Sequence, residues 1–356
     1  MKRYIIYIML FNFILLSCDT SLNVNADYKK IPVVFSLIDK NDTIQYIKLN
    51  KAFLGDASVS EMAQVSDSLN YDDASVHIVK YYNDNVVATY EFVKTDTIIK
   101  DEGYFANDNN IIYVFNGSII EEGENSADYN YKLDINIDGV DNVSSETKLV
   151  SDVVVLAPLG YNSPNQKNEI MLYNNDYLSK VYEFKSGENA KYFEYFLEIS
   201  YYEKVNGEYK LKTITHSEGS KNASSLDGGQ TFPFTLNGET FYKFIAEELE
   251  PSSEDRIFYS LRYKFLSAGE DLSMYIDLTK PTYGIVQEKP AFTNIVNGWG
   301  LFSSRTSTFS PRKRLDLSSL IYLSEGDEVK DLKFKDYTNT VNFYTNHPEL
   351  DTYNIY

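Results

Sequence analysis

The sequence predicts a mainly β protein: an N-terminal immunoglobulin-like or transthyretin-like β-sandwich, followed by a second antiparallel β domain with one short amphipathic helix. Three observations support this fold class. The 356 residues include 31 Tyr and 21 Phe but one Trp, and aromatic side chains pack well on a pleated sheet. Several segments alternate apolar and polar residues, which is the period of a strand. Residues typical of turns separate these segments at short intervals.

The first seventeen residues are typical of a secretory signal. Lys2 and Arg3 precede an apolar run over residues 4–16, which is too short for the roughly 20 residues of a membrane-spanning helix. Ser17 then stands directly before Cys18, the only cysteine in the chain. A small residue before a cysteine, after two leucines, is the pattern of a lipobox. We therefore expect cleavage before Cys18 and lipidation of its thiol; the alternative is an ordinary signal peptide with a chance cysteine.

Lipidation would fix the mature protein to the cell envelope. Each buried methylene contributes about 0.8 kcal/mol and one chain holds a protein only weakly, so several acyl chains (palmitate or similar) on Cys18 are needed for firm attachment. The polar residues 18–30 are typical of a tether. We expect the protein at the outer membrane; the sequence leaves open whether it faces the periplasm or the cell surface.

The charge of the mature chain excludes one class of partner. Without Lys2 and Arg3, 31 basic residues stand against 52 acidic ones, a net charge of −21. Such a charge repels phosphate backbones and anionic headgroups. We therefore expect no nucleic-acid binding.

The N-terminal β-sandwich domain is expected over residues 31–157. Ile31–Ile38 and Thr43–Leu49 are separated by a four-residue turn, which predicts a hairpin. Val59, Met62 and Ala63 have helical spacing and predict a short helix after it. Further strands are expected at Val76–Tyr82, Val86–Val93, Ile111–Phe115 and Asn130–Ile137.

The second β-rich domain is expected over residues 158–310, after a Pro- and Gly-containing segment. Residues 193–201 and 257–265 alternate strictly, which predicts two central antiparallel strands with Glu paired to Arg or Lys on the exposed face. Residues 241–249 have helical spacing after the candidate cap Asn237 and predict the amphipathic helix. DLSMYIDL (271–278) is expected as a strand. A C-terminal extension is expected over residues 311–356, with residues 331–356 as extended or partly disordered chain.

Weak chemical motifs have simpler structural interpretations. Asp134, Asn136 and Asp138 match half of a calcium loop, but Ser145 stands where the pattern needs a bidentate carboxylate; a strand running into a turn is the preferred interpretation. The three histidines form no metal or triad motif, and no pair of carboxylates is singled out for hydrolysis. The basic PRKR run (311–314) is expected as a solvated turn; the alternative is a contact to headgroups or an acidic partner. The sequence nominates no catalytic residue, metal or cofactor.

Trp299 lies between Gly298 and Gly300 in the segment AFTNIVNGWGLFSSR. Its preferred interpretation is a core anchor, because glycines let backbones approach closely. The alternative is a contact to a ligand or partner, since tryptophan is a common platform for sugars.

The chain resembles a family of uncharacterised envelope lipoproteins of the Bacteroidota. The lipobox, the opening IPVVFSLIDKNDTIQYIKLNKAFLGD, the central AKYFEYFLEISYYE and the late TNIVNGWGLFSSR carry this resemblance over nearly the whole mature chain. It implies a β-rich envelope protein and gives no catalytic residues. Such families often occur beside outer-membrane TonB-dependent transporters, which suggests a partner of that kind.

These observations favour a lipid-anchored envelope protein with a non-catalytic binding or assembly role, accessory to an outer-membrane transporter. One alternative is a glycan- or small-ligand-binding surface lipoprotein that uses Trp299 or clustered tyrosines. A second alternative is an unrecognised hydrolase.

The variant Cys18→Ala tests the anchor. Because it removes the thiol that would carry lipid, we expect the protein to leave the membrane fraction or to remain unprocessed. Membrane fractionation and intact-mass measurement check this, and unchanged attachment would overturn the lipobox interpretation.

Overall fold

The computed structural model describes residues 31–52, 61, 63–65, 69–98, 110–156, 168–280 and 292–356. The signal 1–17 and the tether 18–30, with Cys18, lie outside the described residues. So do Val59 and Met62 of the expected short helix, and residues 157–167 at the expected domain boundary.

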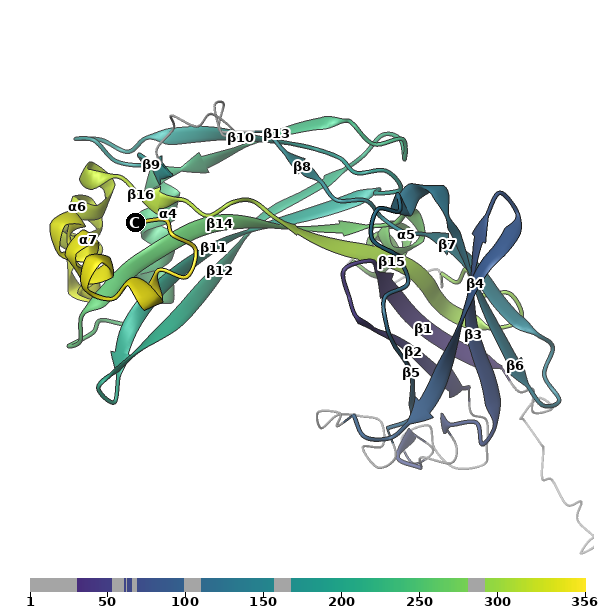
Figure 1. Ribbon diagram of the computed structural model, residues 1–356. Coiled ribbons are helices and arrows are strands. Elements are labelled where there is room, and N and C mark those ends of the chain that lie inside the picture. Colours follow the sequence, from purple (N-terminus) through teal and green to yellow (C-terminus); the bar gives the residue numbers. More distant parts are fainter. Residues whose placement is uncertain are drawn as a thin grey trace, which may run out of the picture.

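The described chain is mainly β, as predicted, and one large sheet organises it (Figure 1). Eleven of the described strands pair in the order β12-β11-β14-β15-β1-β2-β5-β4-β3-β6-β7. In chain order they are β1 Pro32–Asp39, β2 Ile44–Lys51, β3 Ala74–Tyr82, β4 Asn85–Thr95, β5 Ile112–Asn116, β6 Asn130–Ile137, β7 Val143–Lys148, β11 Tyr192–Val205, β12 Glu208–Asn222, β14 Arg256–Ala268 and β15 Trp299–Phe309.

The other elements cover this sheet or connect its strands. The order β13-β10-β8 forms a second sheet, and β16 pairs with β9. These strands are β8 Val154–Val155, β9 Glu169–Ile170, β10 Ser179–Lys185, β13 Thr231–Asn237 and β16 Arg314–Leu315. The helices that lie wholly within the described residues are α4 Gly238–Glu248, α5 Glu270–Thr279, α6 Leu317–Glu325 and α7 Tyr337–Asn346, with 3-10 turns η1 Ser126–Asp128, η2 Lys330–Leu332 and η3 Pro348–Leu350.

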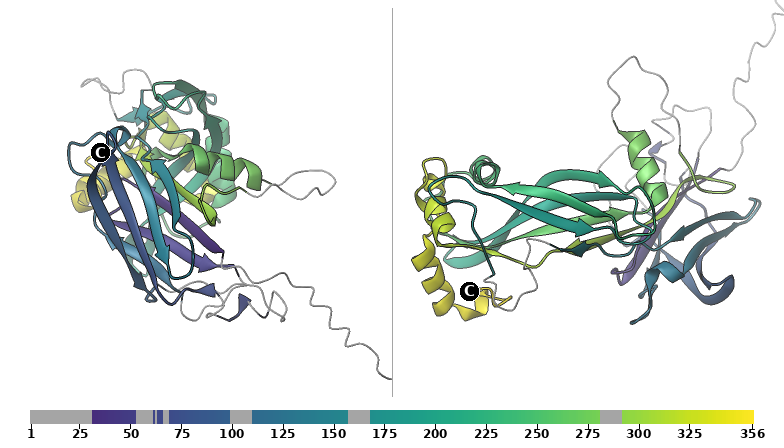
Figure 2. Two further views of the ribbon diagram at one scale, coloured as in Figure 1. Left: turned by 90° about the vertical axis from the view of Figure 1, so that its right-hand side faces the viewer. Right: turned by 90° about the horizontal axis from the view of Figure 1, so that it is seen from above.

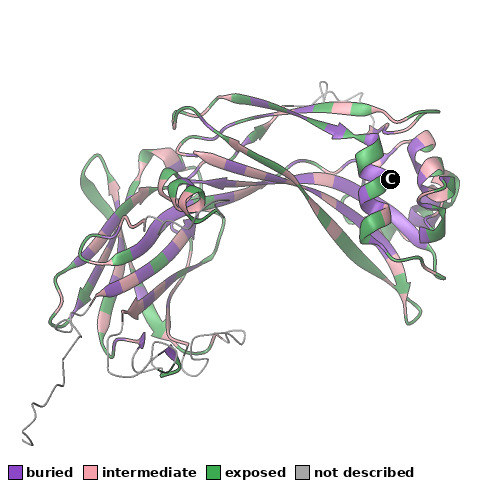
Figure 3. Ribbon diagram, turned by 180° about the vertical axis from the view of Figure 1, so that it is seen from behind, coloured by how far each residue is buried: buried purple, intermediate pink, exposed green. Residues whose placement is uncertain are grey.

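Strands β1 to β7 form the N-terminal half, where the sheet folds over a core of its own. The predicted hairpin is present as β1 and β2, and β6 has the predicted bounds. Buried residues alternate with more exposed ones along β2, β3 and β6 (Figure 3). The core includes Val34, Ile47, Ile78, Leu133 and Phe302.

The C-terminal half has two sheet layers (Figures 1 and 2). A largely aromatic core packs between them. Strands β11 and β14 pair antiparallel at the centre, as predicted. The expected charge pair on this sheet is Glu198 with Arg262, whose atoms are 2.7 Å apart. Phe184 of the second sheet packs against Phe265 and Phe232 with centroid distances of 4.9 and 5.2 Å. Such ring pairs stabilise the core beyond the area they bury.

Helix α4 confirms the predicted amphipathic helix. The Asn237 side chain caps it by accepting a hydrogen bond from the Thr240 N–H at 3.1 Å, which satisfies a backbone donor at the helix start. Phe241, Tyr242 and Ile245 on one face are buried in the core.

The strand expected at residues 271–278 is wrong, because this segment forms α5. Gly269 begins the helix, and Glu270 and Asp271 place negative charge in its first turn, where the helix dipole favours it. The helix lies on β15, where the Leu272 N–H donates to the Ser303 hydroxyl at 3.3 Å. The short sequence fits a strand and a helix about equally well, and packing against β15 decides in favour of the helix.

The expected extended C-terminal region is also wrong. Helix α7 lies within it, capped by Asp336, and packs Phe343 and Tyr344 against Tyr202 and Tyr259 on the other face of the β11/β14 layer. The β-branched and aromatic residues of this segment have modest helix propensity. Burial of the two rings against the sheet stabilises the helix instead.

The PRKR run is likewise not a solvated turn. Arg312 donates to the Ser260 hydroxyl at 2.8 Å and lies 4.5 Å from the Tyr353 ring centroid. Arg314 pairs with Glu169 at 2.7 Å. Burial lowers the pKa of Lys313, which is 6% exposed. The run therefore holds the C-terminal segment against the sheet.

The calcium-like motif is a strand end, as the preferred interpretation stated. Strand β6 ends at Ile137, and Gly139 has a φ of +70° in the following turn. Asp134 accepts a hydrogen bond from the Asn142 amide at 2.6 Å. No group of three or more acidic, His or Cys side chains suited to a metal occurs among the described residues.

Strand β15 joins the two halves. It pairs antiparallel with β14 and then parallel with β1, from Val33–Trp299 to Asp39–Arg305. Gly300 makes the parallel pairing sterically allowed: its φ is +119°, and a Cβ placed there would lie 1.9 Å from the Val34 carbonyl oxygen. Only glycine fits such a close backbone approach.

We expect Gly300→Ala to destabilise the protein by about 3 kcal/mol or more, because it adds a backbone clash to an unfavourable φ. The control is Gly229→Ala, where φ is +76° but a Cβ would have nothing within 4 Å; only the conformational cost of about 1–2 kcal/mol applies there. Urea unfolding measures both. Equal losses would contradict the close-approach argument.

Candidate functional site

Part of the N-terminal sandwich carries apolar side chains on its outer surface. We call this surface the apolar outer face. It lies on β15, β1, β2, β5 and β4 and consists of Val33, Phe35, Ile44, Tyr46, Val93, Val114 and Trp299.

Strand register places these side chains on one side of the sheet, together with Lys48 and Asn50 of β2, which lie opposite Phe35 and Val33. Tyr46 lies opposite Val114, and Val114 lies opposite Val93. Val33 lies beside Trp299 in the parallel ladder. Tyr46 is 42%, Trp299 46% and Val93 66% exposed. Exposed apolar side chains that gather on one side of a sheet mark interaction sites on soluble proteins.

The local sequence explains why the face is apolar. Strand β1 buries Val34 and Ile38 on its inner side, while Val33 and Phe35 point outward. A strand that is apolar on both sides normally has both sides covered. Here α5 covers part of the outer side, where its Tyr275 ring lies 6.2 Å from that of Phe35. Among the described residues of the face, Ile44, Tyr46 and Val93 are exposed.

The structure corrects the preferred interpretation of Trp299. The side chain is half exposed and lies outside the core clusters of the described residues. Asn297 turns the chain with a φ of +58° and donates its side-chain amide to the Asn142 carbonyl at 2.8 Å. A contact of Trp299 to a ligand or partner stays a prediction. The exposure of its side chain is what such a contact requires.

The other candidates from the sequence do not come together. Cys18 lies outside the described residues. His77 is on β3, His216 is on β12 beside Phe244 with centroids 4.5 Å apart, and His347 follows α7. The sequence patterns did not indicate Phe35, Tyr46 or Val93 as site residues. The apolar character of both sides of β1 was the signal that could have indicated them.

A pocket of about 450 Å³ lies where the two halves meet. Its walls include Asp152, which pairs with Lys40 at 2.6 Å, and Gly187, where a Cβ would lie 2.1 Å from the Ser151 carbonyl oxygen. The Thr308 hydroxyl also donates to Asp152, at 3.1 Å. These contacts bind the halves to each other, so we interpret the pocket as part of the junction.

Comparison with known proteins gives little guidance. No family model matches the chain, and no curated protein matches it. Among solved structures, a DUF4785 family protein from Legionella pneumophila is similar to it at 15% sequence identity, with a TM-score of 0.20. The match covers 65% of this chain and 51% of that one, so the chain spans about half the length of that protein. A similarity this low carries no argument about function.

Substitutions at two adjacent residues of β2 test whether the apolar outer face is exposed to solvent in the free protein. We expect Tyr46→Thr to change the free energy of unfolding by no more than about 0.5 kcal/mol, because the side chain is exposed. Ile47→Ala removes a fully buried side chain and is expected to cost about 2–5 kcal/mol. Chemical unfolding compares them. A large loss for Tyr46→Thr would show that the ring is covered in the free protein.

Proposed function

We propose that the protein is a non-catalytic docking component of the cell envelope, a lipoprotein of the Bacteroidota family described above, anchored through lipid on Cys18. The apolar outer face is the observation that carries the proposal. Its aromatic residues Phe35, Tyr46 and Trp299 are of the kind that anchor protein interfaces. None of the helices in the described part of the chain is long and apolar enough to span a bilayer.

The tether limits where a partner can be. Residues 18–30 reach at most roughly 45 Å when fully extended. The tether leads directly into β1, which contributes Val33 and Phe35 to the face. A surface held this close to the bilayer by its own strand is suited to a partner embedded in the same membrane.

An integral outer-membrane protein suits the face better than the bilayer does. The mature net charge of −21 opposes contact with anionic headgroups. An apolar face rich in β-branched and aromatic residues can instead dock against a protein surface that excludes water. A TonB-dependent transporter is the partner we propose, at the outer membrane.

The exposure of Trp299 supports a second function, the binding of a glycan or small ligand with this ring as platform. A glycan array with the lipoprotein and with Trp299→Ala tests it, and equal binding by both proteins removes the site. The described residues give no observation that favours a hydrolase.

Site-specific photo-crosslinking tests docking. A photoreactive residue at the position of Tyr46 or Val93 is expected to give one dominant adduct with an integral outer-membrane protein. The control position is Val181, which is 57% exposed on β10 of the other half. Phe35→Lys should abolish the adduct from position 93, because it places a charge inside the interface.

Two outcomes would contradict docking to a membrane protein. One is an adduct with lipid alone, which would make the bilayer the partner. The other is the same protein adduct from position 181, which would indicate crowding at the membrane instead of a specific face.

A further inference from the structure

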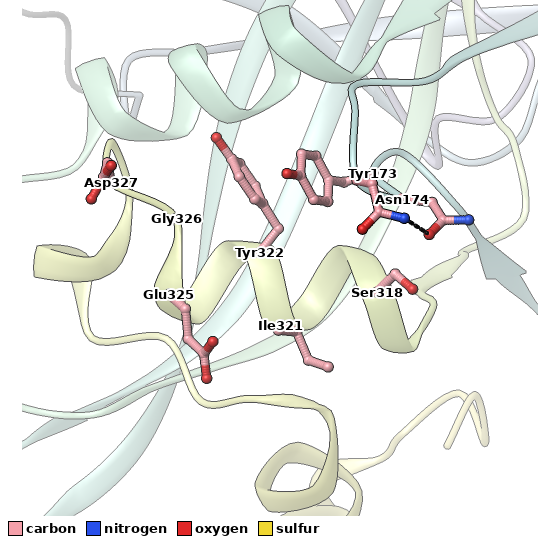
Figure 4. A pocket seen from close by; sticks show the side chains of 9 residues that line it. Tyr173, Asn174, Ser318, Ile321, Tyr322, Glu325, Gly326 and Asp327 are labelled. Atoms are coloured by element: carbon pink, nitrogen blue, oxygen red, sulfur yellow. Dashed lines mark hydrogen bonds between the residues drawn. The ribbon is translucent and has the colours of Figure 1, made fainter.

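A second candidate site lies at the opposite end of the molecule from the apolar outer face (Figure 1). It is a pocket of about 480 Å³ between the loop after β9 and helix α6 (Figure 4). This volume lies within the range of about 300–1,000 Å³ that is usual for small-ligand sites. The docking proposal makes no use of it.

Two tyrosine rings form a fixed wall of this pocket. Tyr173 stacks on Tyr322 with centroids 3.9 Å apart and an interplanar angle of 21°. The Ser319 hydroxyl of α6 accepts hydrogen bonds from the backbone N–H groups of Leu172 and Tyr173, at 2.8 and 3.1 Å. The loop is thus tied to the helix, and the wall exists before any ligand binds.

A partly buried network of hydroxyl and carboxylate groups holds the second ring in place. Tyr177 and Tyr322 both donate to the Glu328 carboxylate, at 2.5 and 3.1 Å. Burial, together with the neighbouring carboxylate, raises the pKa of Tyr177 well above its ordinary value and raises the pKa of Tyr322 as well. Both hydroxyls therefore remain donors at neutral pH, and the Tyr322 ring is fixed at both ends.

The polar groups of the pocket select among ligands. Its lining contains no basic residue, and Glu325 and Asp327 repel anions. Asn174 and Asn175 each supply an amide that can donate and accept. Asp327 already pairs with Lys330 at 2.7 Å, which lowers the pKa of Asp327. The polar side is therefore suited to a neutral ligand with many hydroxyl groups.

We propose that this pocket binds one pyranose unit of a neutral glycan, with the sugar's C–H face on the side of the Tyr173 ring that Tyr322 does not cover and its hydroxyls on Asn174, Asn175 and Glu325. Carboxylates and amides accept and donate the paired hydrogen bonds that adjacent hydroxyls need. The tyrosine wall supplies the apolar contact. The site is separate from Trp299, so either one can fail without the other.

Saturation-transfer NMR on the detergent-solubilised full-length lipoprotein tests the proposal with methyl glycosides of glucose, galactose and mannose. We expect transfer from protein aromatic protons to at least one of them. Tyr173→Phe should retain binding because the ring remains, whereas Tyr173→Ala should weaken it at least about tenfold.

A second variant changes only exposed residues of the pocket, so a loss of binding cannot be ascribed to misfolding. Asn174→Ala combined with Glu325→Gln should also weaken binding at least about tenfold, since it removes hydrogen bonds that include a charged acceptor. Glu349→Gln, an exposed carboxylate beside His347, is the matched control and should bind normally. Failure of all three glycosides, full binding by the double variant, or binding of tetramethylammonium with no sugar binding would each overturn the proposal.

Discussion

The parallel ladder between β1 and β15 is the interaction on which the rest of the structure depends. It pairs Val34 with Gly300, two residues 266 positions apart. Strand β1 therefore pairs with β2 within the first hairpin, but its other partner, β15, lies near the C-terminal end of the sequence. Bringing such distant segments together costs loop-closure entropy. Gly300 allows the close backbone approach that the ladder needs, and with β14 on its other side, β15 makes the sheets of both halves continuous.

The same ladder creates the apolar outer face. It places Trp299 beside Val33, while the β1–β2 hairpin and its pairing with β5 and β4 extend the surface to Tyr46 and Val93. The sandwich core needs only the inner side of these strands. The outer apolar side chains contribute nothing to that core, which is why we assign them to docking.

The C-terminal half depends on aromatic packing on both sides of the β11/β14 layer. Phe184 and its neighbours fill one side, and α7 with Tyr344 covers the other. Arg312 and Arg314 hold the last segment against the sheet through hydroxyl, carboxylate and ring contacts. The pocket lined by Tyr173 and Tyr322 lies beside α6 in this half, at the opposite end of the molecule from the apolar outer face.

The sequence by itself determined the features that depend on local period and local caps: the hairpin, strand β6, the central β11/β14 pair with Glu198 and Arg262, and α4 with its Asn237 cap. Each follows from side-chain alternation or a nearby hydrogen bond. Only the tertiary structure decided the helix at Glu270–Thr279, the packing of α7, the exposure of Trp299 and the partnership of β1 with β15. Those features depend on which distant surface covers a segment, and short-range patterns carry no information about that surface.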